Sequence, residues 1–200
     1  MARVLVPLAQ GCEELEAVTV VDLLRRADIE VVTAGLDEQP VCASRGMVLV
    51  PDMTLERALL QDYDMIVLPG GLPGADNLRD DERIIERLRS MSAAGKYTAA
   101  ICAAPKVLAH AGLLQGKRAT SFPGALETDH IPGLEYQERA VVMDGKVITS
   151  RGPGTAMDFA LFSILPSVLL TAGPVSVATF SLANCSGAVA WVSILDSQKK

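Results

Sequence analysis

Short hydrophobic runs alternate with amphipathic segments along the first half of the chain. The apolar runs are RVLVPL at 3–8, IEVVTAG at 29–35, YDMIVLPGG at 63–71 and YTAAIC at 97–102. Runs of this length, rich in branched side chains, are typical of strands buried on both faces, and the segments between them are long enough for crossover helices. The pattern therefore predicts an open α/β sandwich in which helices cover both faces of a parallel sheet.

Three amphipathic segments are predicted to be helices. In the first, between Gln10 and Asp28, apolar residues recur at helical spacing and charged residues take the opposite side. Its apolar positions are Ala17, Val20, Val21 and Leu24, and its charged positions are Glu14, Asp22 and Arg25. The other two are 81–95 and 103–112, the latter with proline in its first turn and glycine at its end.

Two segments have the pattern of antiparallel hairpins. The first is 40–50, with Gly46 near its middle, and the second is 139–150, with an Asp144-Gly145 turn. Asp-Gly between alternating apolar residues is a strong signal for a tight hairpin turn. A small antiparallel hairpin is therefore expected beside the parallel sheet.

The C-terminal region lacks charge over a long stretch. No charged side chain occurs from Phe159 to Leu195, but Pro166, Gly173 and Pro174 interrupt the apolar run. A membrane span needs about 18 or more nearly continuous apolar residues. We therefore expect no membrane association, and instead a buried C-terminal helix followed by a strand-like segment that covers the sheet or a subunit contact.

Composition narrows the class of protein. The 200 residues fit a single domain, 1–200, and a net charge of −6 without basic clusters disfavours a stable complex with nucleic acid. The four cysteines, Cys12, Cys42, Cys102 and Cys185, form no C-x-x-C pair and no zinc pattern with histidine. The first apolar run is too short for the core of a signal peptide. These features predict free thiols, a cytoplasmic location, and neither metal nor cofactor.

Cys102 lies where a predicted strand turns into a predicted helix. A helix N-terminus favours the thiolate, and a sharp strand-to-helix turn exposes a nucleophile. Most free cysteines, however, are small buried hydrophobes. Position alone leaves packing and chemistry equally open for this residue.

Acidic residues and glycines supply possible partners for the thiol. Glu13 and Glu16 fall on the apolar side of the first helix, where a charge is costly unless it is paired or protonated, whereas Glu14 is expected to face solvent. Helical periodicity does not choose between Glu13 and Glu16 as a proton-transferring acid. Gly70-Gly71 ends a strand, and its amides could approach a ligand as an oxyanion hole.

The histidines are not placed to activate the thiol. His110 lies eight residues beyond Cys102 on the same predicted helix, roughly 12 Å away at 1.5 Å per residue. His130 falls in a loop. An ordinary cysteine protease with a Cys-His pair is therefore disfavoured.

Five stretches resemble, in order, motifs of the ThiJ/PfpI superfamily. They are GCEELEAVTVVDLLRRADIEVVTAG, SRGMVLVPD, YDMIVLPGG, AAICAAPKVL and TSRGPGTAMDFAL. The resemblance runs from about Arg3 to Leu161 and is strongest for the branch that contains the human parkinsonism-associated deglycase and its bacterial counterpart YajL. Residues 162–200 depart from the family, whose members usually continue with a charged amphipathic helix and a short apolar end.

The resemblance implies a flavodoxin-like sandwich, usually a homodimer, with a reactive cysteine at position 102. It implies that Glu16 is the protonated acid beside that cysteine, which resolves the choice left open by periodicity. It also implies roles around the thiol for five further residues. The backbone amides are those of Gly70, Gly71 and Ala103, Arg45 lies at the active-site mouth, and Phe122 replaces a histidine of the human branch.

The function expected from the resemblance is cysteine-dependent deglycation of methylglyoxal or glyoxal adducts on proteins or nucleotides. Glyoxalase turnover should be weak because Phe122 cannot transfer a proton. Peptidase activity is not expected, because the protease-like branch has histidine where this chain has Ala103. The alternative is an oxidative-stress sensor and redox-regulated chaperone that uses oxidation of Cys102.

Overall fold

The computed structural model describes residues 2–171, 180–183 and 189–192. Its main feature is a seven-stranded sheet in the order β10-β11-β7-β6-β1-β2-β5, parallel except for the edge strand β10. The strands are β1 (Arg3–Leu8), β2 (Glu30–Gly35), β5 (Met53–Thr54), β6 (Met65–Leu68), β7 (Tyr97–Ile101), β10 (Val141–Asp144) and β11 (Val147–Ser150). The predicted parallel sheet is confirmed.

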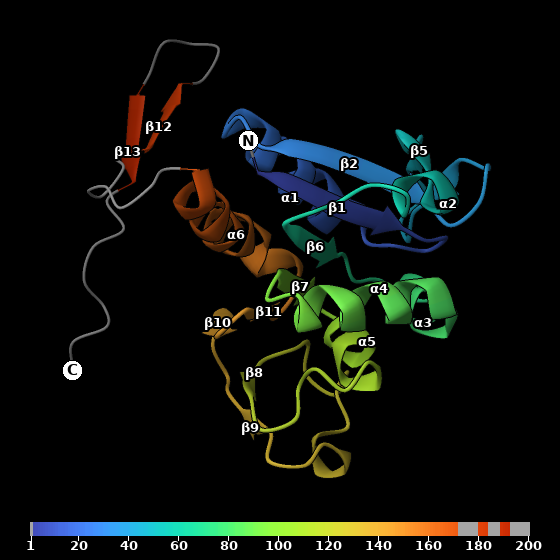
Figure 1. Ribbon diagram of the computed structural model, residues 1–200, viewed down its shortest axis with the longest axis vertical. Coiled ribbons are helices and arrows are strands. Elements are labelled where there is room, and N and C mark those ends of the chain that lie inside the picture. Colours follow the sequence, from blue (N-terminus) through green and yellow to red (C-terminus); the bar gives the residue numbers. More distant parts are fainter. Residues whose placement is uncertain (1, 172–179, 184–188, 193–200) are drawn as a thin grey trace.

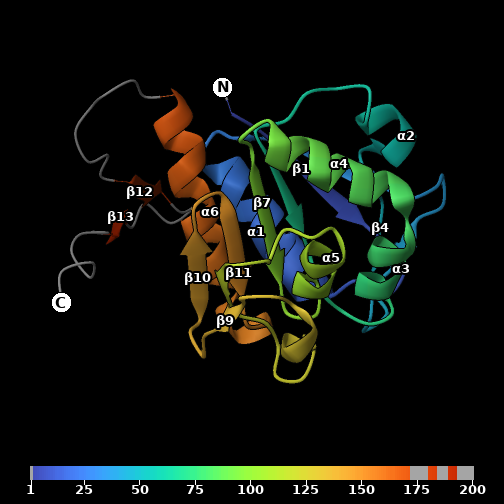
Figure 2. The same ribbon diagram turned by 60° about the horizontal axis from the view of Figure 1, so that its bottom comes forward.

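Helices cover both faces of this sheet (Figures 1 and 2). One face carries α1 and α6, and the other carries α3, α4 and α5, as the two separate hydrophobic cores show. The bounds are α1 (Glu14–Arg26), α2 (Leu55–Ala58), α3 (Gly74–Asp80), α4 (Glu82–Ala93), α5 (Pro105–His110) and α6 (Ala156–Thr171), with the 3₁₀ turns η1 (Thr128–His130) and η2 (Pro153–Thr155). The three predicted helices correspond to α1, α4 and α5.

Alternation along the strands explains why both faces need helices. In β1, Leu5 belongs to the core under α3, α4 and α5, whereas Val4 and Val6 belong to the core under α1 and α6. Successive side chains of a strand point to opposite faces, so a strand without polar residues must be buried on both. The continuous apolar runs in the sequence are therefore the direct cause of the layered fold.

Both predicted hairpins form. β3 (Val41–Cys42) pairs with β4 (Val48–Leu49), and β10 pairs with β11 through the two-residue loop Gly145-Lys146, one residue later than the expected turn. The second hairpin joins the main sheet as its edge, because β11 also pairs with β7. A further short pair, β8 (Arg118–Ala119) with β9 (Glu135–Tyr136), was not predicted.

The predicted C-terminal helix is confirmed as α6. Its first turns bury Phe159 and Ile164, and it packs against α1. Beyond it, β12 (Phe180–Ala183) and β13 (Val189–Val192) pair with each other outside the main sheet. The predictions for Cys185 and for residues 172–179, 184–188 and 193–200 lie outside the described residues.

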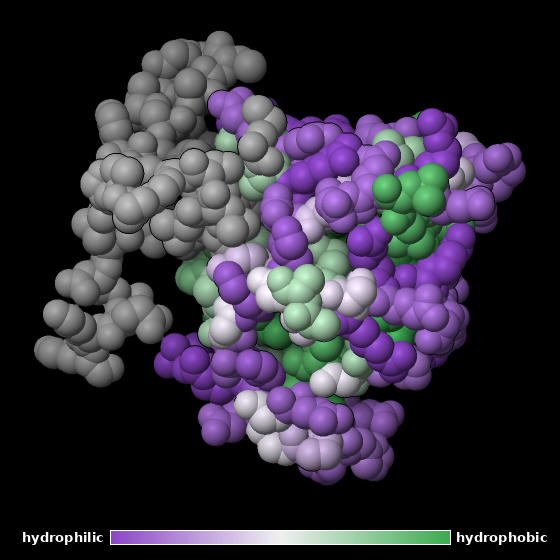
Figure 3. Space-filling view, viewed as in Figure 1, coloured by the Kyte–Doolittle hydropathy of each residue, from purple (hydrophilic) through white to green (hydrophobic). Residues whose placement is uncertain are grey.

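The surface of the described residues contains both hydrophilic and hydrophobic areas (Figure 3). Over the described ranges, no helix combines the length and apolar content needed to cross a membrane. The face seen in Figure 3 is largely hydrophilic, with a hydrophobic spot over α2, and Leu60 just after this helix is 86% exposed.

Candidate active site

Cys102 lies at the sharp turn between β7 and α5. Its backbone has φ +62°, a left-handed conformation that residues other than glycine rarely adopt and that costs of order 1–3 kcal/mol. The turn is held on both sides, because the Cys102 N–H donates to the carbonyl of Ser150 at 3.0 Å and its carbonyl accepts from the Phe122 N–H at 2.8 Å. The predicted strand-to-helix elbow is therefore present, with the thiol half-buried at its tip.

Glu16 lies on α1, and its carboxyl group lies beside the Cys102 thiol. Its side chain is fully buried, with 0% exposure, and Oε2 accepts a hydrogen bond of 2.8 Å from the Gly70 N–H. Burial raises the pKa of Glu16 to about 7, and the opposing hydrogen bonds from Gly70 and the Cys102 thiol only partly offset it. An acid of this kind changes protonation state near neutral pH, which suits proton transfer.

The thiol itself is not acidified. Burial, followed by the negative charge of Glu16, raises the pKa of Cys102 to about 12, although the N–H groups of Gly71 and Ala103 act in the opposite direction. This differs from the expectation that the helix N-terminus would favour the thiolate. The reason is that burial of the sulfur, together with the carboxylate beside it, outweighs the stabilising amides at the start of α5. While Glu16 is ionised, the proton stays on sulfur.

The three predicted backbone amides divide between two acceptors. Those of Gly71 and Ala103 interact with the Cys102 sulfur, whereas that of Gly70 is bound to Glu16. The expectation that the Gly70 amide faces the thiol is therefore wrong, because the buried carboxylate takes this donor. Gly70 is still confined by the site, since a Cβ built on it would lie 2.6 Å from the Cys102 Cβ.

A cavity of about 470 Å³ opens over the thiol and brings the other predicted residues together. Cys102, Gly71, Ala103, Arg45 and Phe122 all line it. Glu13, one of the two candidate acids, lines it as well. The sequence did not indicate the other lining residues, which are Ser44, Leu72, Pro123, Gly124, Ala125 and Pro153. The segment 123–125 has no periodic pattern that could have placed it here.

Glu14 is not where the sequence placed it. The prediction of a solvent-facing side chain is wrong, because Glu14 is only 7% exposed. Its carboxylate accepts hydrogen bonds from the N–H of Arg45 and the hydroxyl of Ser44 in the β3–β4 hairpin. A hairpin distant in sequence therefore covers the side of the helix that periodicity assigns to water.

The two histidines do not take part in the site. His110 ends α5, His130 pairs with Glu127 at 3.1 Å, and neither lines the thiol cavity. Within the described ranges, no group of three or more His, Cys, Asp or Glu residues could hold a metal ion.

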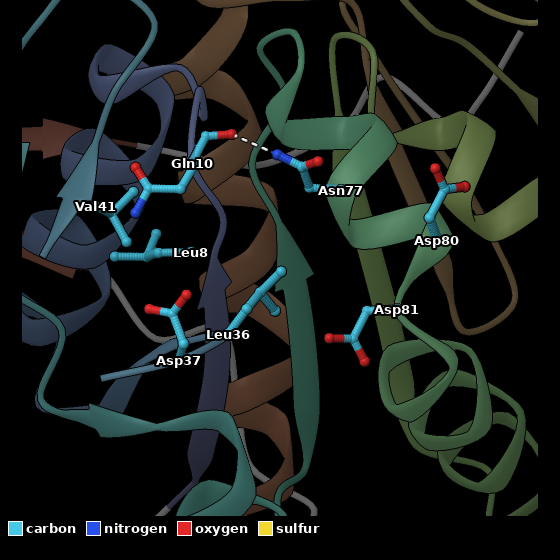
Figure 4. Close-up of a pocket in the computed structure, with 8 residues that line it drawn as sticks. All are labelled: Leu8, Gln10, Leu36, Asp37, Val41, Asn77, Asp80 and Asp81. Carbon is cyan, nitrogen blue, oxygen red and sulfur yellow. Dashed lines mark hydrogen bonds between the residues drawn. The ribbon is translucent and has the colours of Figure 1, made fainter. Parts of the chain in front are cut away.

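A second cavity, of about 360 Å³, lies at the end of β1 and contains no thiol (Figure 4). Asp37 and Asp81 stand on opposite sides of it, and Asn77 donates to the carbonyl of Gln10 at 2.9 Å. Asp81 forms an ion pair with Arg83. The residues that line this cavity include no thiol that could act as a nucleophile.

Comparison with known proteins identifies the family. A profile of the DJ-1/PfpI family matches residues 2–165. The Parkinson disease protein 7 homolog of Danio rerio is 46% identical over 165 residues, which cover 80% of this chain and 86% of that protein. Protein DJ-1 homolog B of Arabidopsis thaliana is 44% identical over 161 residues, covering 80% of this chain but 36% of the relative, so this chain spans about a third of that longer protein.

Two further relatives bear on fold and activity. The glutathione-independent glyoxalase DJR-1.2 of Caenorhabditis elegans is 36% identical over 160 residues, covering 80% of this chain and 84% of that protein. The crystal structure of Drosophila melanogaster DJ-1beta superposes with a TM-score of 0.78 at 40% identity, covering 83% of this chain and 90% of that one. The architecture and the sequence agree, and the chain belongs to the DJ-1/PfpI family.

Proposed function

We propose that this protein is a cysteine-dependent deglycase that acts on adducts of methylglyoxal or glyoxal. The observation that carries the proposal is the pairing of the Cys102 thiol with a buried Glu16 of raised pKa, at the floor of an open cavity. The relation to a glyoxalase supports chemistry on small dicarbonyl compounds. The adducts are those that such compounds form on thiols, amines or guanidines of proteins and nucleotides.

The first step uses the arrangement of the pair. The sulfur of Cys102 displaces the amine or thiol from the aldehyde-derived carbon of the adduct, while Glu16, in its ionised form, takes the thiol proton and passes it to the leaving group. Glu16 then removes the hydrogen of that carbon as a proton, the electrons of the C–H bond move toward the neighbouring ketone oxygen, and the amides of Gly71 and Ala103 are the nearest donors for the developing charge. A base beside the sulfur is needed because the free thiol is otherwise weakly ionised.

The later steps return the proton and release the product. Glu16 returns this proton to the former ketone carbon, which leaves a hydroxyacyl group bound to sulfur as a thioester. Water then cleaves this thioester to a hydroxy acid and restores the thiol. The net reaction consumes one water and needs no oxidant, because the aldehyde carbon is oxidised as the ketone carbon is reduced.

The test is release of the hydroxy acid. Purified protein incubated with freshly formed methylglyoxal adducts of a cysteine or arginine derivative should release lactate, and Cys102→Ser should not. Equal lactate release by the two proteins would reject the proposal. Glyoxalase turnover should be weak in the same preparation, because Phe122 offers no second proton-transfer group.

A second candidate function is oxidative-stress sensing, with redox-regulated chaperone activity. The observation that favours it is that amides and a protonatable acid surround the Cys102 sulfur, where they would donate hydrogen bonds to sulfinate oxygens. Mild peroxide should add two oxygen atoms to Cys102 before other thiols change. Earlier oxidation of exposed Cys42, measured by mass spectrometry, would count against it.

We also propose that the protein is a cytoplasmic homodimer. Exposed apolar side chains lie on α1, namely Leu15 and Val18, and on the β3–β4 hairpin, namely Met47, Val48 and Val50. An exposed apolar patch on a globular protein is typical of an interface. Light scattering should give twice the chain mass, and Val48→Lys should reduce it to one chain.

A further inference from the structure

The mouth of the Cys102 cavity contains one cationic side chain. Arg45 and Glu13 are the charged residues that line it, from opposite sequence segments. In the part of the chain that the structure describes, the Arg45 guanidinium has no ion-pair partner, whereas Glu13 accepts a hydrogen bond of 2.8 Å from the Ser44 hydroxyl. The cation is therefore available to a ligand that enters the cavity.

Glu14 anchors the turn that carries Arg45. Its Oε1 and Oε2 atoms lie 3.0 Å and 3.1 Å from the Arg45 backbone N, and Oε1 lies 3.5 Å from that of Met47. The Ser44 hydroxyl approaches Glu14 Oε2 at 3.2 Å. Burial of the carboxylate alone would raise its pKa, but these donors hold the pKa of Glu14 below its ordinary value. The anchor is thus an anion at neutral pH.

The anchored turn has few other attachments. The Ala43 N–H donates to the Met47 carbonyl at 2.8 Å, and the Ser44 N–H donates to the Cys12 carbonyl at 2.8 Å. Gly46 occupies a left-handed conformation with φ +94° at the tip. Without the Glu14 carboxylate, the N–H groups of Arg45 and Met47 would have only water as acceptor, and the tip would be held from one side.

We propose that Glu14 is a positioning residue that holds Arg45 at the cavity mouth, where Arg45 recognises a negatively charged group on the substrate. The site would then favour adducts that carry a carboxylate or a similar anion near the reacting carbonyl over neutral ones. This inference rests on the proposed function, because it names the charge class of the substrate at that same site.

The experiment compares two alkylating reagents at Cys102. Iodoacetate is anionic and iodoacetamide is neutral, but both transfer a similar group to sulfur, so the ratio of their rates reports the charge at the mouth. Rates are measured on the full chain by mass spectrometry of the Cys102 peptide, at low ionic strength. One charge at a solvent-exposed cavity mouth should change the ratio of the two rates about threefold, and added salt should remove this effect.

The expected results separate the two residues. Arg45→Met should lower the iodoacetate-to-iodoacetamide ratio about threefold, and Glu13→Gln should raise it. Glu14→Ala and Glu14→Gln remove the same charge, but only Gln keeps a side-chain oxygen that can accept from the turn, so the ratio should be lower in Glu14→Ala than in Glu14→Gln. Arg57→Met, which removes the same charge from an exposed position of α2, should leave the ratio unchanged. Hydrogen exchange should become faster at 43–49 in Glu14→Ala, while the rest of the chain stays protected.

Two results would overturn the inference. An unchanged ratio in Arg45→Met removes anion recognition, and equal ratios in Glu14→Ala and Glu14→Gln remove the positioning by Glu14. Alkylation requires no turnover. Absence of lactate release would therefore reject the deglycase proposal without altering these ratios.

Discussion

The backbone N–H of Gly70 donates a hydrogen bond of 2.8 Å to Oε2 of Glu16, across 54 residues of sequence. The bond joins the end of β6 to α1, directly under Cys102 at the end of β7. Two parallel strands and one helix therefore meet at the reactive group. The carboxyl ends of such strands are the usual place for a ligand site in an open α/β sheet.

Gly70→Ala should damage both stability and the site. The added Cβ would lie 2.6 Å from the Cys102 Cβ and 2.8 Å from Glu16 Oε2, so the backbone or the buried pair must shift. Overpacking of this kind costs about 1–3 kcal/mol, which denaturant unfolding would measure. The matched control is Gly154→Ala, where a Cβ meets nothing within 4 Å. Equal unfolding free energies for the two variants would refute this reading.

Glu16 should make stability depend on pH. Its folded-state pKa of about 7 lies above the ordinary value of 4.5, so the folded protein holds the proton more tightly than the unfolded chain. Stability from this group is complete below about pH 4.5 and is lost as pH rises through 7, by roughly 3 kcal/mol.

Glu16→Gln removes this titration. Relative to wild type, the variant should gain stability between pH 5 and pH 8, as followed by thermal unfolding at several pH values. Glu82→Gln, at the exposed first position of α4, should show no such gain. A constant difference between Glu16→Gln and wild type over this range would contradict the raised pKa.

The same substitution should separate thiol reactivity from turnover. Removing the Glu16 charge removes one of the causes that raise the pKa of Cys102, so alkylation by iodoacetamide should shift to lower pH. Lactate release should nevertheless fall by about a hundredfold, because the proton carrier is lost. If Glu16→Gln increased both the alkylation rate of Cys102 and the rate of lactate release, Glu16 would not be the catalytic acid-base group.

Phe122→His should strengthen glyoxalase turnover. The Phe122 ring packs over Gly152 beside the Cys102 sulfur, and an imidazole there would supply a second proton-transfer group. General acid-base assistance is worth at least about tenfold, measured as lactate formation from free methylglyoxal. Phe122→Leu serves as the matched apolar control and should give no increase.

Much of the fold was predictable because strand and helix periods are local properties. The apolar runs predicted β1, β2, β6 and β7, and the periodic segments predicted α1, α4 and α5. The turn of the β10–β11 hairpin was displaced by one residue, because either Asp144-Gly145 or Gly145-Lys146 can form a tight loop. The β8–β9 pair has only two residues in each strand, too few for a recognisable alternation.

The candidate site was predictable in part. Cys102 at a strand end follows from the apolar run before it and the proline after it, and Glu16 was one of two acids on the apolar face. The contributions of Ser44 and residues 123–125 to the cavity were missed. They lie in turns, where no periodic pattern indicates which way a side chain points.

The sequence by itself determined the order of the elements, the layered sheet and the position of a thiol at a strand-to-helix turn, because these depend on neighbouring residues. Only the tertiary structure decided that Glu14 is buried, that the Gly70 amide serves Glu16, and that the pKa of Cys102 is raised rather than lowered. Burial and charge at one point are sums over segments that are far apart in sequence, and the fold alone brings those segments together.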